Sequence, residues 1–334
     1  MPLRTLCFQL NTFLSGPQAW FFLAEERGYL HDVGLALEFV EGDTAANVVP
    51  KMSGGDFDVG YGDINALIEH AAQNKPHEPL AVFAAYNTSP YTLAVAASSN
   101  IKAPADLAGR RLVTHPNDAA LKLFPEFCAA TGLDFSSVQI EESSAPHSAL
   151  VPRLLAGEWD GMFGFVNTII AASLDAGIAN PRAHIRFLEY HDFVPDWYGM
   201  ALMVTRKLTH DEPDVVRALL SALNRGLVDT VADPEAAIDA LASYCKRVGK
   251  DFNRASNLQR LVGTLALEMG REEGARLGIG DLDDARLQRG IRLLATNEKL
   301  VNQKIARVPR ATELFDRSFL PPLNERVQTL YRSG

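Results

Sequence analysis

The sequence predicts an α/β protein of two lobes, each a mainly parallel sheet flanked by helices, followed by a helical C-terminal tail. Two observations predict this organisation. The segment GGDFDVGYGDINALI at residues 54–68 is echoed by AGEWDGMFGFVNTII at residues 156–170, at a constant offset of 102. Strand-like and helix-like segments also alternate up to about Thr205, and every later segment has helical spacing.

The echo consists of identities and of aromatic matches at one offset. Phe57 aligns with Trp159, and Tyr61 aligns with Phe163. The identical pairs are Gly55/Gly157, Asp58/Asp160, Gly62/Gly164, Asn65/Asn167 and Ile68/Ile170. Since chance rarely produces such a set, we expect each lobe to contain an equivalent turn from a strand into a helix.

The first lobe shows four apolar, strand-like runs separated by helical spacing. Gly28 provides a stop for the first helix, and Asp63 stands at the N-cap position of a helix at 64–73. The predicted strands are residues 4–11, 35–43, 57–62 and 80–86, and the predicted helices are residues 18–30, 44–52 and 64–73.

The second lobe repeats this order. Its predicted strands are residues 110–115, 138–143, 159–165, 185–190 and 198–204, and its predicted helices are residues 116–133, 147–157 and 166–177. Residues 89–99 and 201–207 are expected to be extended connections between the lobes. The predicted division is residues 1–94 with 204–334 for lobe one and 95–203 for lobe two, with a hinge near 92–97 and 200–206.

The composition excludes several classes of protein. The 334 residues are 47% hydrophobic and 22% charged with a formal charge of −9, so we expect no nucleic-acid partner. The three cysteines are far apart, which predicts no metal site, and no motif calls for a cofactor. No apolar run is long enough for a membrane span, and no export signal is recognisable. The protein is therefore cytoplasmic, or an export signal has been removed.

Ligands of open parallel sheets bind beyond the carboxyl ends of the strands, where loops and helix N-termini converge. Gly62 and Gly164 serve either turn geometry or close backbone approach. Asn65 and Asn167 serve either a local cap or a ligand contact. The candidate ligand-binding residues are Asn11, Thr12, Asp43, Tyr61, Gly62, Asp63, Asn87 and Tyr91 in the first lobe and its crossover, and His115, Asn117, Phe163, Phe165, Asn167 and Trp197 in the second.

Four stretches carry a resemblance to a known family: residues 17–43, 52–63, 101–115 and 213–238. In their order and spacing they resemble the solute-binding proteins of ABC importers, which have the type 2 periplasmic-binding fold. The similarity lies with the branch that contains sulfonate, taurine and nitrate binders and the binders of thiamine's pyrimidine precursors.

The resemblance implies a receptor rather than an enzyme. Such a receptor closes its two lobes on a small ligand and then meets the permease subunits of an importer in the membrane. It implies a monomer without catalytic residues or cofactor, located in the periplasm or held outside the cytoplasm by a lipid anchor.

The candidate residues favour one kind of ligand. Aromatic side chains can stack on a flat ring while carboxylates and amides pair with its edge, which suits a nitrogen heterocycle such as a thiamine pyrimidine precursor. The alternative is a sulfonate, taurine or another small organic anion, for which THPND at 114–118 and NTSP at 87–90 offer hydroxyls and helix N-termini.

Two further classes are weighed against the receptor. A relative with this fold makes the thiamine pyrimidine from pyridoxal phosphate and a histidine with the help of iron, which implies a Schiff-base lysine and a cysteine cluster. Lys51 and His70 are the residues that could take part, but no cysteine cluster exists. Regulators with this fold carry a helix-turn-helix, and none precedes the first predicted strand.

Overall fold

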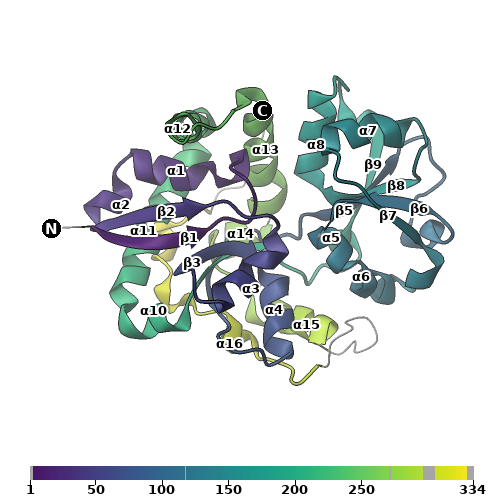
Figure 1. The fold of residues 1–334 in the computed structure, drawn as a ribbon. Helices are drawn as coiled ribbons and strands as arrows, with labels where there is room; N and C mark the ends of the chain where they lie inside the picture. Colours follow the sequence, from purple (N-terminus) through teal and green to yellow (C-terminus); the bar gives the residue numbers. More distant parts are fainter. Residues whose placement is uncertain (1–2, 117, 271, 296–304, 329–334) are drawn as a thin grey trace. The chain divides into compact units, whose positions relative to one another are not determined.

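The computed structural model describes residues 3–116, 118–270, 272–295 and 305–328. The chain forms two compact units (Figure 1). The first unit comprises the chain up to Thr88 together with the chain from Tyr198 onward, and the second unit runs from Ser89 to Trp197. Each unit is described by itself below.

The first unit is built on a five-stranded sheet in the order β2-β1-β3-β10-β4. β10 is antiparallel to both β3 and β4, while β1 is parallel to β2 and β3, so four strands share one direction. The strands are β1 (Arg4–Gln9), β2 (Leu35–Val40), β3 (Val59–Asp63), β4 (Leu80–Ala84) and β10 (Met200–Val204).

Helices from both ends of the chain cover this sheet. α1 packs against α11 and α12, which come from the C-terminal tail. The N-terminal helices are α1 (Ala19–Glu26), α2 (Tyr29–Asp32), α3 (Val48–Ser53) and α4 (Ile64–Ala72). The tail contains α10 (Arg206–Asp211), α11 (Pro213–Ala232), α12 (Pro234–Arg247), α13 (Arg254–Thr264), a π-helix η6 (Leu265–Met269), α14 (Glu272–Leu277), α15 (Asp284–Ala295) and α16 (Ala311–Leu314).

The second unit repeats the sheet pattern in the order β7-β6-β8-β5-β9, with β5 antiparallel to both neighbours. Its strands are β5 (Tyr91–Ala96), β6 (Arg111–Thr114), β7 (Gln139–Glu142), β8 (Gly161–Phe165) and β9 (Ile185–Glu189). Its helices are α5 (Ala119–Lys122), α6 (Phe124–Thr131), α7 (His147–Leu155), α8 (Val166–Asp175) and α9 (Pro181–His184). Both sheets are therefore mixed, with a parallel majority, as expected.

The echo in the sequence corresponds to an echo in structure. β3 and β8 have the same length at the offset of 102, and α4 and α8 begin directly after them at that offset. Each of these strands also pairs with an antiparallel strand, since Asp63 lies opposite Met200 and Phe165 lies opposite Tyr91. The turn from strand to helix thus falls at equivalent positions in the two units, although only the first turn has a side-chain cap, from Asp63.

The predicted extended connections are internal strands in the structure. β5 lies between β8 and β9, and β10 lies between β3 and β4. The two units divide between Thr88 and Ser89 and between Trp197 and Tyr198. Each strand thus belongs wholly to one unit, whereas the sequence analysis put both boundaries inside a strand. An apolar run looks alike in a connection and in a buried strand, which explains the difference. A hinge motion between the units stays a prediction.

Within the described ranges, the chain after β10 contains helices and two isolated bridges, at Phe315 and Gly280, rather than further strands. None of the described helices has the length and the apolar character needed to cross a bilayer. The predicted helical tail is present.

Candidate ligand-binding site

The carboxyl ends of β1 and β3 bring buried amides together at one edge of the first unit's sheet. Asn11 follows β1, and its Oδ1 accepts a hydrogen bond from Gln18 Nε2 at 2.6 Å. Its Nδ2 points at the sulfur of Met200 at 3.9 Å, a weak acceptor. Thr12 is half-buried, and its carbonyl accepts from the Gly42 amide at 3.1 Å.

Asp63 and Asn65 form the turn between β3 and α4, and both are buried. Asp63 is the N-cap residue, as predicted, and its Oδ1 accepts from the Asn65 backbone amide at 3.0 Å and from Asn65 Nδ2 at 2.9 Å. Nδ2 also donates to the Tyr198 carbonyl at 2.9 Å. Because both partners of Nδ2 are acceptors, the orientation of the amide is fixed.

In this arrangement the amide nitrogen of Asn65 is fully engaged, and its amide oxygen accepts no hydrogen bond from the described residues. Asn65 is fully buried, and its Oδ1 has no hydrogen-bond partner among the described residues. Burying an amide oxygen without a donor is costly, so such an atom usually meets water or a ligand. The amide oxygen of Asn65 is therefore a buried acceptor without a donor among the described residues.

Asp43 lies in the loop after β2 and is exposed. Lys51 Nζ and Asn47 Nδ2 each donate to its carboxylate at 2.9 Å. Partial burial alone would raise the pKa of Asp43, but these two hydrogen bonds lower the pKa to about 2. Asp43 is therefore an ionised carboxylate already engaged by a cation.

Tyr61 and Gly62 lie within β3. The ring of Tyr61 is fully buried and packs edge-on against Trp20 and Phe21 of α1, and burial raises its pKa. A β carbon on residue 62 would lie 2.6 Å from Cβ of Val48, so Gly62 allows the first residue of α3 to pack closely on the strand. Core packing accounts for both residues, and a ligand contact by either stays a prediction.

Asn87 ties the connection after β4 to the C-terminal tail. Its Nδ2 donates to the Met269 carbonyl at 2.6 Å, and the neighbouring Thr88 amide donates to the Glu268 carbonyl at 3.2 Å. Both acceptors belong to the π-helix η6, a rare element that is often found at functional positions. This contact with η6 gives Asn87 a structural role, and its predicted role as a ligand contact stays a prediction.

In the second unit, His115 follows β6 and meets a histidine that the sequence analysis missed. His115 Nε2 lies 3.1 Å from Nδ1 of His147, the first residue of α7, and burial lowers the pKa of His115. The sequence gives no local sign of this pair, because the two histidines are 32 positions apart. Asn117 lies outside the described residues.

The remaining candidates of the second unit divide between core and edge. Phe163 is buried against Phe124 with ring centroids 5.0 Å apart. Phe165 is half-buried at the end of β8, and its ring meets Tyr91 edge-on at 5.3 Å. The other two are Asn167, buried as the second residue of α8, and Trp197, buried next to Tyr190.

Each edge therefore has a distinct chemistry. The first unit presents amides and carboxylates, and the second presents imidazoles and aromatic rings. Among the described residues, no group of three histidines, cysteines or carboxylates is placed to hold a metal ion. Gln18 and His147 are edge residues that were not among the predicted contacts, whereas Asn65 was considered as either a cap or a contact.

A family model described as "NMT1/THI5 like" matches residues 18–237, more than half of the chain. The chain belongs to this family. The resemblance found in the sequence is thereby confirmed at the level of the family. The NMT1/THI5-like assignment covers the echoed turns of both units and the first helices of the tail.

Solved structures confirm the periplasmic-binding fold of this family member. The alkanesulfonate-binding protein SsuA from Xanthomonas axonopodis pv. citri, bound to MOPS, is similar with a TM-score of 0.66 at 15% identity, over 95% of this chain and 100% of that chain. The periplasmic aliphatic sulphonate binding protein SsuA from Escherichia coli has a TM-score of 0.67 at 14% identity, over 93% and 97%. At these identities the likeness shows the fold alone.

Proteins with enzyme names also resemble the chain. It is 22% identical over 245 residues to 4-amino-5-hydroxymethyl-2-methylpyrimidine phosphate synthase of Schizosaccharomyces pombe (strain 972 / ATCC 24843), which covers 70% of this chain and 67% of that protein. A mutant of DSZB in complex with biphenyl-2-sulfinic acid has a TM-score of 0.59 at 16% identity, over 96% and 98%. The NMT1/THI5-like family and its structural neighbours thus include binding proteins and enzymes.

Proposed function

We propose that this member of the NMT1/THI5-like family is the substrate-binding component of an ABC importer. Its two units close on a small ligand, and the closed form engages permease subunits in the membrane. The protein acts as a monomer outside the cytoplasm, in the periplasm or on a lipid anchor. The ligand is a nitrogen heterocycle, such as a pyrimidine precursor of thiamine.

The observation that carries the ligand class is the buried amide oxygen of Asn65. Its amide is held by Asp63 and by the Tyr198 carbonyl, so the oxygen is left to accept. An aminopyrimidine supplies an N–H donor and a flat ring, whereas the head group of a sulfonate supplies acceptors only. The half-buried ring of Phe165 at the equivalent turn of the second unit supports stacking.

The acidic residues support this ligand class less than the sequence suggested. Asp43 is occupied by Lys51 at 2.9 Å, and one oxygen of Asp63 already accepts two hydrogen bonds from Asn65. The proposal therefore depends on the Asp63–Asn65 turn rather than on two separate carboxylates.

A small organic anion is the second candidate, and the histidine pair favours it. An imidazole N–H of the pair and the N-terminus of α7, where His147 stands, would both donate to an anion even with neutral rings. Sulfonate binders among the solved structures share the fold, which supports this alternative without deciding it.

The residues do not fit the pyridoxal phosphate chemistry of a pyrimidine synthase. Lys51 Nζ is engaged by Asp43, and His70 Nε2 is shared between Ser53 Oγ and the Pro76 carbonyl, each at 3.2 Å. The three cysteines are unpaired thiols distributed over β1, α6 and α12, so they form no cluster. These placements support a binding protein.

A titration panel tests the proposal. Isothermal titration of the purified protein with 4-amino-5-hydroxymethyl-2-methylpyrimidine, a set of alkanesulfonates and taurine should give heat with the pyrimidine. Asn65→Ala should weaken that binding about tenfold or more, since a buried hydrogen bond to a ligand is worth roughly 1–2 kcal/mol. Binding of sulfonates alone would reject the heterocycle, and turnover of any compound would reject the receptor.

Asn224 provides the matched control. It is equally buried, its Nδ2 donates to the Glu325 carbonyl at 2.9 Å, and its Oδ1 also has no partner among the described residues. It lies in α11 rather than in the turn between β3 and α4. Asn224→Ala should lower stability without changing affinity, so a loss of binding in both variants would mean that general destabilisation explains the effect.

A further inference from the structure

Both chain connections between the units begin in one group of contacts inside the first unit. The connection after β4 leaves through Asn87 and Thr88, and the returning connection enters at Tyr198. Arg286 of α15 donates from Nη1 to the Asn87 carbonyl at 2.9 Å, and its guanidinium lies 4.0 Å from the centre of the Tyr198 ring. One arginine therefore touches both connections.

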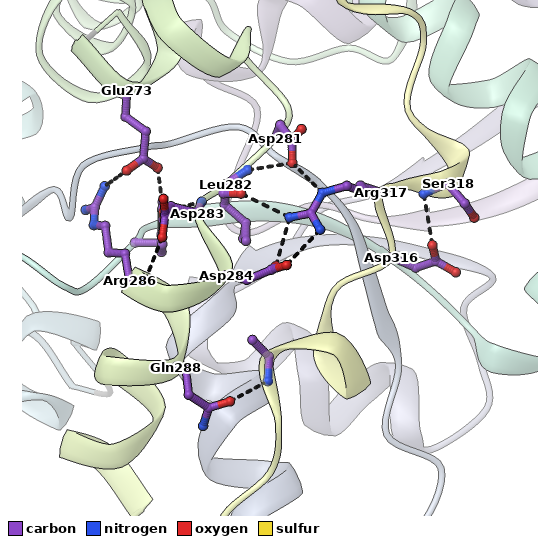
Figure 2. A network of polar contacts seen from close by, with 12 residues as sticks. Glu273, Asp281, Leu282, Asp283, Asp284, Arg286, Gln288, Asp316, Arg317 and Ser318 are labelled. Atoms are coloured by element: carbon purple, nitrogen blue, oxygen red, sulfur yellow. Dashed lines mark hydrogen bonds and ion pairs between the residues drawn. The ribbon is translucent and has the colours of Figure 1, made fainter.

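Glu273 of α14 completes the group. Its Oε2 accepts from Arg286 Nη1 at 3.1 Å, and its Oε1 accepts a hydrogen bond from the Tyr198 hydroxyl. The same hydroxyl accepts from the Asp283 amide at 2.9 Å. Figure 2 shows the Glu273–Arg286 pair beside the start of α15. The side chains of the pair are only about 15% exposed, so the pair is more sheltered than an ordinary surface salt bridge.

Close packing and backbone bonds fix the first connection further. A β carbon on residue 274 would lie 2.3 Å from Asn87 Nδ2, so Gly274 allows α14 to touch the asparagine. The Thr88 amide is bonded to Glu268 of η6, and the next bonded group along the chain is the Pro90 carbonyl, which accepts from the Val166 amide in the second unit. Ser89 alone separates these two anchored residues.

The second connection is anchored just as close to the division. The Trp197 amide donates to the Val194 carbonyl within the second unit at 3.4 Å. Its neighbour Tyr198 is held in the first unit by Glu273, Arg286 and Asn65. The freedom between the anchored ends is thus confined to the link between Trp197 and Tyr198.

We propose that Arg286 and Glu273 are positioning residues that clamp both connections and restrict the bending of the chain to Ser89 and to the Trp197–Tyr198 link. The inference rests on the proposed receptor function, because a defined pivot matters for a protein that closes on a ligand. It also moves the expected hinge a few residues toward the N-terminus in both connections, away from 92–97 and 200–206, which are strands β5 and β10 in part.

The test measures the distance between the units in the protein without ligand. Spin labels on Asp56→Cys in the first unit and Gln139→Cys in the second, both exposed positions, are read by pulsed electron resonance with the half-buried Cys7 replaced by alanine. Arg286→Met should broaden the distribution of distances about twofold relative to the parent, because both connections lose their shared anchor. Glu273→Gln, a milder change, should broaden it less.

Arg317 offers a matched control in the same tail. It donates to Asp284 at 2.8 Å and to Asp281 at 3.2 Å, and both partners lie outside the two connections (Figure 2). Arg317→Met should lower the melting temperature about as much as Arg286→Met does, but it should leave the distribution of distances between the spin labels unchanged. Equal broadening in both variants, or none in Arg286→Met and Glu273→Gln, would overturn the clamp.

The outcome is separable from that of the proposed function. The distances are measured without ligand, so a protein that binds no compound of the titration panel could still show the broadening. That result would keep the clamp and reject the receptor. If the protein binds the pyrimidine and the distribution of distances is unchanged in Arg286→Met and Glu273→Gln, the receptor is kept and the clamp is rejected.

Discussion

The imidazoles of His115 and His147 share one hydrogen bond, with 3.1 Å between Nε2 of His115 and Nδ1 of His147, and their ring centroids lie 4.2 Å apart. One of the two nitrogens must carry the proton while the other accepts it. The pair cannot keep this bond if both rings are fully protonated. The charge of this edge of the second unit is therefore sensitive to pH.

The lowered pKa of His115 predicts a loss of stability in mild acid. Burial holds this pKa below its ordinary value of 6.5. The unfolded chain then takes up a proton at higher pH than the folded chain, so the free energy of unfolding falls as the pH drops through about 6.5 and levels off below the lowered pKa. Urea unfolding at several pH values should show a smaller fall for His115→Gln than for the wild type.

The exposed His31 supplies the control for this series. His31→Gln removes an exposed side chain of α2 in the first unit and leaves the histidine pair intact, so it should keep the slope of the wild type. If His115→Gln also kept that slope, the histidine pair would not be the group that responds to acid.

Glu126 of α6 predicts the opposite dependence on pH. Its side chain is 5% exposed, and burial raises its pKa to about 7. The folded chain then holds a proton that the unfolded chain releases, so stability falls as the pH rises from about 4.5 through 7. Glu126→Gln should stabilise the protein at pH 8 by on the order of 1–3 kcal/mol and have little effect at pH 4.

Chemical unfolding of Glu126→Gln beside Glu142→Gln checks this prediction. Glu142 is an exposed carboxylate of the same unit, at the end of β7, and its replacement should change stability little at either pH. A Glu126 variant that is destabilised at pH 8 would show that the carboxylate is ionised and satisfied in the folded protein.

Asp63 combines two roles that substitutions can separate. Asp63→Ala removes both the cap of α4 and the acceptor that orients Asn65, so it should cost about 1–2 kcal/mol of stability and weaken binding of the pyrimidine. Asp63→Asn keeps a capping oxygen but removes the charge. Its stability should stay near the wild type, and its affinity, measured by titration, should fall only if the ligand carries positive charge.

Local features of the fold could be predicted from the sequence. The cap by Asp63 and the equal lengths of β3 and β8 depend on residues only a few positions apart, so a local sequence pattern is enough to predict them. Family resemblance added the fold of the whole chain. The separate candidates Tyr61 and Phe163 lie in the aromatic cores, because an aromatic in an apolar strand carries no sign of which face it will occupy.

Distant pairs could not be predicted. Asn87 meets Met269 across 182 positions, and His115 meets His147 across 32, so no local pattern links them. The same holds for Arg286, which reads as an ordinary surface residue of an amphipathic helix. Only the packing of the tail on the first unit brings it to both connections.

The close approach of Val48 to Gly62 gives a prediction about packing alone. A β carbon at position 62 would lie 2.6 Å from Val48 Cβ, a separation that side chains do not tolerate. Gly62→Ala should therefore push the start of α3 away from β3 and cost about 2 kcal/mol or more. Val48→Ala alone should cost about 1–2 kcal/mol for the lost methyl groups. Combined, the two changes should cost less than the sum of their separate costs, because the smaller residue makes room for the new methyl group.

Thermal and urea unfolding of the two single variants and the double variant measure this coupling. Strict additivity would mean that Gly62 is required by something other than Val48, and a ligand that approaches the backbone at this turn would then become the explanation to test by titration.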